Sequence, residues 1–472
     1  MNLLKSTATV GSATILSRIL GFVRDVILAK VFGASGETDA FFLAFKIPNF
    51  MRRLFAEGSF SLAFVPVLSE YKARGDHEAL RDLVDHVTGT LAAVLLVLTA
   101  IGVIAAPLVL SVFAPGWLVE GRPEFDLSAG MLRITFPYIL LISLTALAGG
   151  ILNTFERFLI PALTPVLLNI SLITAALLLT GRMQVPVTAL AWGVLAAGIA
   201  QLLLQVPALM RLGLMPRPRW GWRHSGVRRI LKLMIPTLIG SSVAQVNLLF
   251  DSIIATFLVS GSVSWLYYSD RLLEFPLGVL GIALATVILP NLSQKHAKAS
   301  TAEFSATLDW ALRLAVIVTV PAAVGLIVLA GPILTTLFQY DAFQQDDVRM
   351  ASYSLIAYSA GLPAFIAVKV LAPGYYARQD TRTPVKIAIT AMVTNMVLNL
   401  AFVGALLGYG FAGPHAGLAL ASSVAAYLNA GLLYRGLRRR QVYTPERGWI
   451  RVWLAVMVAC AAMGALLSFM TY

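Results

Sequence analysis

Residues 91–110, LAAVLLVLTAIGVIAAPLVL, form a stretch of 20 residues without a charged side chain. An α-helix needs about 20 such residues to cross the hydrocarbon core of a bilayer. The whole chain has a similar character: of its 472 residues, 58% are hydrophobic and only 12% are Asp, Glu, Lys or Arg. An ordinary soluble domain has roughly 25% charged residues. The composition therefore excludes a soluble globular protein and predicts an all-α polytopic membrane protein.

We predict thirteen transmembrane spans, because apolar stretches of sufficient length recur along the whole chain. Their approximate ranges are 8–32, 38–70, 83–113, 128–153, 158–180, 186–210, 227–258, 263–294, 303–338, 348–371, 384–407, 414–434 and 449–472. The single cysteine, Cys460, excludes a disulfide framework and a thiolate metal cluster.

The loop cations predict the orientation of these spans. The N-terminus and the even-numbered connections hold 23 Lys and Arg residues, whereas the odd-numbered connections hold two, Arg122 and Arg182. Lys and Arg in short loops are retained on the cytoplasmic side, so we expect the N-terminus to be cytoplasmic. The net charge of +13 would suggest nucleic-acid binding in a soluble protein. Here it predicts membrane orientation and contact with anionic lipids, and no nucleic-acid partner.

Eleven further cations lie inside the spans, and six of them fall in the first two: Arg18, Arg24, Lys30, Lys46, Arg52 and Arg53. A cation facing lipid at mid-bilayer costs about 2.5 to 3.5 kcal/mol, so these residues must line water or pair with one another. Arg18 and Asp25 are two helical turns apart on one face. The second span carries a stripe of polar residues at spacings of three and four: Lys46, Asn49, Arg53 and Glu57.

The two halves of the chain repeat. The segment SLAFVPVLSEYKA (61–73) aligns with ATVILPNLSQKHA (285–297) at an offset of 224 residues, with Pro66 on Pro290 and Leu68 on Leu292. Similar offsets relate two further pairs, Asp25 with Asp251 and Pro161 with Pro384. An offset of six spans keeps the orientation, which predicts two six-helix lobes in parallel repeat around a central cavity. The expected domains are an N-lobe (1–210), a basic cytoplasmic linker (211–226), a C-lobe (227–440) and an extra helix (441–472).

The sequence offers little sign of enzymatic chemistry. The histidines are spaced for no metal site, and we predict surface or interfacial roles for them: His77, His86, His224, His296 and His415. We therefore predict no catalytic residues, no metal site and no cofactor. A cavity with surplus positive charge in one lobe instead indicates an anionic substrate that must cross the bilayer, and hence a transporter rather than an enzyme.

Four strings resemble the MurJ (MviN) family of lipid II flippases, within the multidrug/oligosaccharidyl-lipid/polysaccharide exporter superfamily. They are the run from Asn2 to Lys72, FPYILLISLTALAGGILNT (136–154), SGSVSWLYYSDRLLEFPLGVLGIALATVILPNLS (260–293) and VKVLAPGYYARQDTRTPVKIAI (368–389). The resemblance implies translocation of undecaprenyl-pyrophosphate-linked disaccharide-pentapeptide from the inner to the outer leaflet of a bacterial plasma membrane, for peptidoglycan synthesis. The family typically has fourteen spans, of which this sequence accounts for thirteen.

The resemblance also implies the site residues. The motifs SRILGFVRD (17–25), PNFMRR (48–53) and YYSDRLLEFP (267–276) carry the cations that are expected to engage the substrate headgroup. The expected substrate-binding residues are Arg18, Arg24, Arg52, Arg271, Asn49 and Ser264, and the expected gating or charge partners are Asp25, Asp39, Glu57 and Glu274. The expected partners are lipid II, membrane lipids and proteins of cell-wall synthesis, with the flippase itself acting as a monomer in the inner membrane.

The energy source is a separate hypothesis. Asp251 is an intramembrane carboxylate, and Asn395 and Asn399 lie one helical turn apart, so their oxygens could hold a hard monovalent cation. Coupling to such an ion or to the membrane potential is the expectation; interhelical hydrogen bonding is the simpler explanation of the same residues.

Four alternatives to a lipid II flippase remain open. A drug or cation antiporter of the same superfamily would need a negatively charged site, and another polyprenyl-linked glycan flippase would share the same lobes. A membrane enzyme acting on polyprenyl phosphates would need an acid, a base or a metal cluster at the interface. A non-transporting membrane scaffold would have no use for buried arginines.

Overall fold

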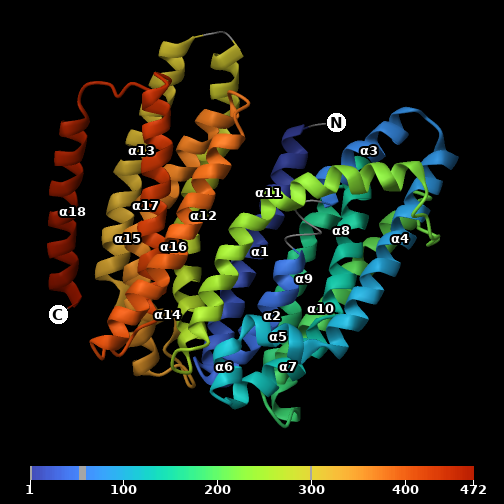
Figure 1. Ribbon diagram of the computed structural model, residues 1–472, viewed down its shortest axis with the longest axis horizontal. Helices are drawn as coiled ribbons and strands as arrows, with labels where there is room; N and C mark the ends of the chain where they lie inside the picture. The colour runs from blue at the N-terminus through green and yellow to red at the C-terminus, as the bar shows by residue number, and fades with distance from the viewer. Residues whose placement is uncertain (1–2, 53–59, 298–299, 472) are drawn as a thin grey trace. The chain divides into compact units, whose positions relative to one another are not determined.

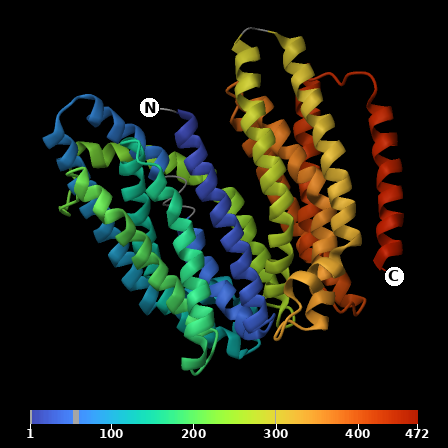
Figure 2. The same cartoon turned by 180° about the vertical axis from the view of Figure 1, so that it is seen from behind.

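Every regular element that the structure describes is a helix (Figures 1 and 2). The structure is a computed structural model that describes residues 3–52, 60–297 and 300–471. Over these ranges the all-α prediction is confirmed. Each of the thirteen predicted spans coincides with one helix or with two consecutive helices.

The chain forms two compact units, Met1–Ser260 and Gly261–Tyr472. The helices of the first unit are α1 (Leu3–Phe32), α2 (Gly36–Met51), α3 (Ser61–Ala73), α4 (His77–Ile104), α5 (Ala106–Phe113), α6 (Pro115–Val119), α7 (Pro123–Thr135), α8 (Tyr138–Thr154), α9 (Leu159–Leu178), the 3₁₀ turn η2 (Thr180–Arg182), α10 (Thr188–Arg211) and α11 (Ser225–Ala255). Those of the second unit are α12 (Ser262–Ala297), α13 (Thr301–Val328), α14 (Ala330–Phe338), α15 (Gln345–Tyr376), α16 (Arg382–Gly408), α17 (Ala416–Arg439) and α18 (Trp449–Thr471).

Nine helical stretches among the described residues are long and apolar enough to cross a membrane. They are α4, α7 with α8, α9, α10, α13, α15, α16, α17 and α18. The other four predicted spans are α1, α2 with α3, α11 and α12. These four carry nearly all of the predicted site residues, so the polar residues are concentrated in a minority of the helices.

Among the predicted spans that the structure describes without a gap, three are interrupted, and proline explains two of the interruptions. Pro107 lies in the first turn of α5, just after α4 ends, and Pro137 precedes α8. A proline lacks the backbone N–H that would continue the preceding helix, but it fits the first turn of a new one. The span 303–338 is likewise divided, between α13 and α14 at Leu329.

The internal repeat places two pairs of equivalent residues in similar surroundings. Leu68 and Leu292 are fully buried, each in the hydrophobic core of its own unit. Pro66 and Pro290 both lie inside a helix with an exposed side chain. Each core joins four or five helices: α3, α4, α8, α10 and α11 in the first unit, and α12, α13, α15 and α17 with the loop after α17 in the second.

The packing units divide the chain later than the predicted lobes do. The helix α11, which the repeat assigns to the second lobe, packs on α3 and α4 in the first unit. The residues that follow α11 are also tied to the first unit: Arg122 donates to the carbonyl of Leu258 (2.6 Å), and Ser260 donates to the carboxylate of Glu124 (2.6 Å). The repeat and the packing therefore place the boundary on opposite sides of α11.

Candidate functional site

The first unit holds a buried polar cluster around Arg24 of α1, whose residue is 5% exposed. Its Nε and Nη2 donate to Oδ1 of Asp25 (3.0 and 2.6 Å), and its Nη1 donates to Oδ1 of Asn169 on α9 (3.0 Å). Asn169 in turn donates from Nδ2 to the carbonyl of Ser17 (3.0 Å). The α1 and α9 helices pack side by side, so a residue 145 positions away fixes the direction of the guanidinium.

Asp25 pairs with Arg24, although the sequence placed it on one face with Arg18. Asp25 is 2% exposed, whereas Arg18 is exposed and has no ion pair or hydrogen bond from its side chain within the described residues. The cation of Arg18 is thus available to a ligand, while that of Arg24 already has a carboxylate partner. A buried ion pair of this kind is favourable only because both charges are paired and hydrogen-bonded.

The predicted residues of α2 lie at its two ends. Near the C-terminal end, Arg52 donates from Nε to Oδ1 of Asn49 (2.8 Å), and both side chains are half-buried. Near the N-terminal end, Asp39 is buried. Glu57 and Arg53 lie outside the described residues, so only Lys46 and Asn49 of the predicted stripe on this span are described.

In the second unit, Arg271 and Glu274 of α12 form an ion pair (2.6 Å). The guanidinium lies over the ring of Tyr267, with 5.2 Å from its carbon to the ring centroid, and its Nε and Nη2 donate weakly to the Tyr267 hydroxyl (3.4 and 3.3 Å). The side chain of Arg271 is 34% exposed and that of Glu274 is 46% exposed, so this pair is far more accessible than the one at Arg24. Ser264, one predicted ligand, is fully buried.

The residues of the hypothetical cation site belong to different units. Asp251 is half-buried on α11 in the first unit, and Asn395 and Asn399 are buried one turn apart on α16 in the second. The binding of an ion by these three residues stays a prediction.

Two residues of the clusters were missed by sequence reasoning. Asn169 is an amide in the otherwise apolar helix α9, which is the signal that could have revealed it, because polar groups in membrane helices usually bond to a neighbouring helix. Tyr267 lies one turn before Arg271, within reach of its side chain on the same helix.

The histidine predictions were wrong in one case. His415 is fully buried, with Nε2 3.0 Å from the carbonyl oxygen of Met350 and its ring against Trp265 (5.0 Å between centroids). The sequence suggested a surface position because His415 lies next to a loop, but the loop folds onto α12 and α15.

The chemistry of the arrangement suits the binding of an anion. Its cations are arginines, which stay charged and can grip a phosphate with two parallel hydrogen bonds.

Comparisons with known proteins identify the family of this chain. Residues 28–471 match the family model described as "Lipid II flippase MurJ". The "Probable lipid II flippase MurJ" of Vibrio cholerae is 50% identical over 98% of this chain and 89% of its own length. The "Lipid II flippase MurJ" of Burkholderia cenocepacia is 44% identical over 99% of this chain and 90% of its own length.

Solved structures agree with the sequence relatives. A structure described as "Lipid II flippase MurJ, inward closed conformation" matches with a TM-score of 0.83 and 30% identity, over 98% of this chain and 93% of that one. An inward-facing MATE transporter of the MOP superfamily matches with a TM-score of 0.68 over 92% of this chain and 98% of that one, but at 14% identity it supports the fold alone. This chain belongs to the MurJ family of lipid II flippases.

Proposed function

We propose that this protein is the flippase that carries lipid II, the undecaprenyl-pyrophosphate-linked disaccharide-pentapeptide, from the inner to the outer leaflet of a bacterial inner membrane. The observation that carries the proposal is the buried arginine Arg24, held by Asp25 and Asn169 in a chain that matches the MurJ family along almost its whole length. A buried cation in a membrane helix is costly, and a polar substrate pathway is the common reason for its presence.

The mechanism that fits these residues is alternating access of two lobes. The substrate diphosphate would pass along arginines, while the prenyl tail stays in lipid. Arginine suits the task because it keeps its charge when buried, whereas a buried lysine readily loses its proton. The substrate would favour closure of the cavity through its higher affinity for the closed state, since a ligand shifts a conformational equilibrium only by such a difference.

The rival functions are less consistent with the same residues. An organic-cation antiporter would be expected to present net negative charge, but the predicted site includes four arginines: Arg18, Arg24, Arg52 and Arg271. Another polyprenyl-linked glycan flippase would use the same diphosphate chemistry and differ only in the sugar-peptide it accepts.

Transport by the purified protein tests the proposal. In vesicles that contain labelled lipid II, we expect protein-dependent movement of the label across the bilayer. A labelled polyprenyl-pyrophosphate glycan without the pentapeptide should move more slowly. Equal transport of both lipids would indicate the broader glycan flippase, and transport of neither would reject a lipid flippase.

The orientation gives a second expected result. In a Cys460→Ala background, cysteines at the exposed positions Glu37, Glu120 and Asp346 should react with an impermeant thiol reagent added outside the cell. Cysteines at His77 and Thr381 should react only after the membrane is opened. We choose Glu120 rather than its neighbour Glu124 because Glu124 is buried and bonded to Ser260. The reverse pattern would overturn the inward N-terminus and the direction of transport.

The hypothesis of cation coupling gives a third expected result. If Asp251 with Asn395 and Asn399 binds sodium, then sodium at about 100 times its Kd should raise the free energy of unfolding by about 2.7 kcal/mol, because it binds only the folded state. Asp251→Asn should remove that gain, and the exposed Asp346→Asn should not. The hypothesis fails if sodium, compared with choline, changes neither the melting temperature nor the transport rate.

A further inference from the structure

The basic segment between α10 and α11 is folded tightly onto α4 in the first unit. The backbone N–H of Arg217 donates to the carboxylate of Asp85 (2.7 Å), and that of Arg219 donates to the Asp85 carbonyl (3.1 Å). The N–H of Gly221 donates to Thr90 (3.1 Å). The contact requires glycine at position 89, because a Cβ there would meet the backbone oxygen of Arg219. The segment is therefore a fixed part of the first unit and not a loose tether.

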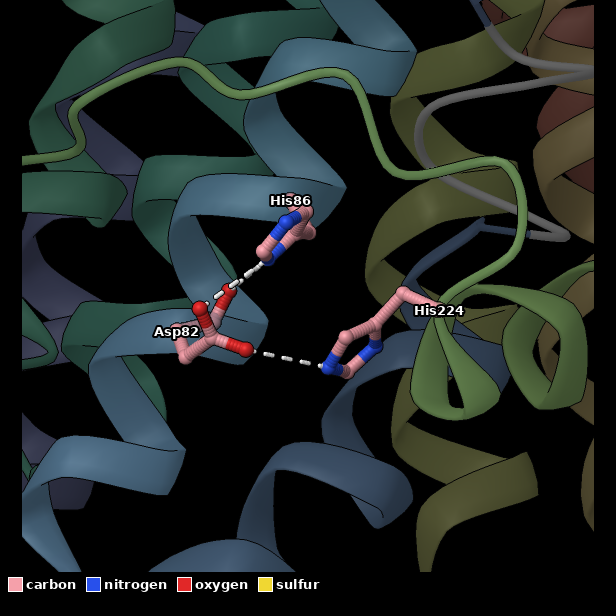
Figure 3. A group of neighbouring side chains, drawn as sticks. All are labelled: Asp82, His86 and His224. Carbon is pink, nitrogen blue, oxygen red and sulfur yellow. Dashed lines mark hydrogen bonds and ion pairs between the residues drawn. The ribbon is translucent and has the colours of Figure 1, made fainter.

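A polar cluster completes this attachment. The carboxylate of Asp82 on α4 lies 3.2 Å from Nδ1 of His86 and 3.3 Å from Nε2 of His224, and the two imidazole rings stack with centroids 4.9 Å apart (Figure 3). His224 caps α11, since its Nδ1 accepts the N–H of Gly226 (3.2 Å). That bond leaves the ring proton on Nε2, the nitrogen that lies 3.3 Å from the Asp82 carboxylate.

The cluster is better suited to holding the segment than to binding a metal ion. A metal at Nε2 of His224 would need the ring proton on Nδ1, where the Gly226 N–H already donates. Arg219 also lies 3.8 Å from the Asp82 carboxylate and would repel a cation. The ligand that this region suits should therefore be an anion.

Two hollows meet beside the cluster. The first, of about 610 Å³, is lined by His86, Trp220, Gly221, Trp222, Arg223 and His224. The second, of about 220 Å³, is almost wholly apolar and lies among α4, α8 and α11, with Leu91, Leu95, Ile230 and Met234 in its wall. Trp222 lines both hollows, so a recess that carries basic side chains, here called the basic recess, and an apolar recess adjoin at one side chain.

Three exposed arginines near the basic recess have no partner in the part of the chain that the structure describes. Within the described residues, the exposed side chains of Arg217, Arg223 and Arg228 make no ion pair or hydrogen bond. Basic side chains already engage the two nearby carboxylates. Asp82 lies against Arg219, His86 and His224. Glu70 pairs with Arg74 and Arg229. Trp220 and Trp222 are 63% and 50% exposed, and tryptophan is enriched where a membrane meets water.

We propose that these two hollows bind one anionic phospholipid of the adjoining leaflet. The lipid phosphate lies between Arg223, in the basic recess, and Arg228, one helical turn after His224 on α11. Trp222 covers the glycerol region, and part of one acyl chain fills the apolar recess. A phospholipid is favoured over a soluble anion because only an amphiphile fills both recesses. The bound lipid would contact α4, α11 and the basic segment between α10 and α11. This binding is independent of lipid II transport.

Tryptophan quenching in nanodiscs tests the proposal on the full chain. Phosphatidylglycerol with brominated acyl chains quenches a nearby indole, and brominated phosphatidylcholine at the same mole fraction reports the quenching by ordinary surrounding lipid. We expect extra quenching with phosphatidylglycerol in the wild type, and much less extra quenching in Trp222→Phe, which lacks the indole that lines both recesses.

The charge variants decide the assignment. Arg223→Gln/Arg228→Gln keeps Trp222 and should weaken the apparent affinity for phosphatidylglycerol about 30-fold, as expected for two charges near a lipid surface. The matched control is Arg435→Gln/Arg439→Gln, which removes two exposed cations from α17 and should leave the affinity unchanged. Melting temperatures check that all variants are folded.

Three results would overturn the proposal. Equal quenching by the two phospholipids would show that no anionic lipid is selected. Unchanged affinity in Arg223→Gln/Arg228→Gln would place the lipid elsewhere. Displacement of the brominated lipid by a stoichiometric amount of undecaprenyl pyrophosphate would identify the occupant as a polyprenyl diphosphate and not a phospholipid. That last result would leave the proposed transport function standing.

Discussion

Arg24→Ala should abolish lipid II transport and also destabilise the protein, and the two effects should separate when Asp25 is changed as well. Arg24 and Asp25 are 5% and 2% exposed, and they share two hydrogen bonds. Removing the arginine leaves a buried carboxylate without its cation, which typically costs about 3–5 kcal/mol. Loss of activity in the single variant would therefore say little about substrate binding.

The double variant Arg24→Ala/Asp25→Asn removes both charges and should recover most of the lost stability. If Arg24 serves the substrate diphosphate, this variant melts near the wild-type temperature and still fails to bind or transport lipid II. The comparison needs melting temperatures in detergent, lipid II affinity and transport rate for the wild type, the two single variants and the double variant. If a well-folded double variant binds lipid II with wild-type affinity, Arg24 has a structural role and does not bind the substrate.

Asn169→Ala offers a milder version of the same experiment. The substitution removes the acceptor for Nη1 of Arg24 but leaves the charge pair with Asp25 intact. We expect the free energy of unfolding to fall by less than in Arg24→Ala, because a hydrogen bond to a charged group is worth about 1.5–3 kcal/mol. Lipid II affinity should fall as well, because the guanidinium of Arg24 loses its fixed direction.

The helices of this fold could be predicted from sequence because bilayer thickness sets a minimum length for each span. All thirteen predicted spans are helical where the structure describes them. The repeat was also readable, since the same burial is required at equivalent positions: Leu68 and Leu292 each enter the core of their unit. These are local properties of a short stretch of chain.

The partners of the charged residues could not be predicted in the same way, because they depend on which helices pack together. Helical spacing placed Arg18 with Asp25, but tertiary packing brings in Asn169 from α9 and leaves Arg18 exposed. His86 and His224 are 138 residues apart, and only the folding of the inter-helix segment onto α4 stacks their rings. Polar residues could thus be recognised as significant without their geometry being known.

Arg271→Ala should abolish or greatly weaken lipid II binding while leaving stability almost unchanged, in contrast to Arg24→Ala. The Arg271–Glu274 pair is 34% and 46% exposed, and an exposed pair contributes roughly 0.2–1 kcal/mol. If the guanidinium grips the diphosphate, its loss removes a charged hydrogen bond of about 1.5–3 kcal/mol, or about 10- to 150-fold in affinity. Arg271→Lys should recover part of the lost lipid II affinity, because lysine keeps the charge but cannot form two parallel hydrogen bonds to a phosphate.

The matched control for this variant is Arg349→Ala. Arg349 also pairs with a carboxylate three residues away, Asp346 at 3.3 Å, and this pair is more exposed than that of Arg271. Both substitutions remove one arginine from an exposed i,i+3 pair, so they should have the same small effect on melting temperature. Lipid II affinity should fall only in Arg271→Ala. If both variants bind lipid II as the wild type does, the headgroup is held by other cations, and Arg271 with its stacked Tyr267 is a surface feature of α12. If both lose affinity equally, the effect follows from net charge alone and not from a defined contact.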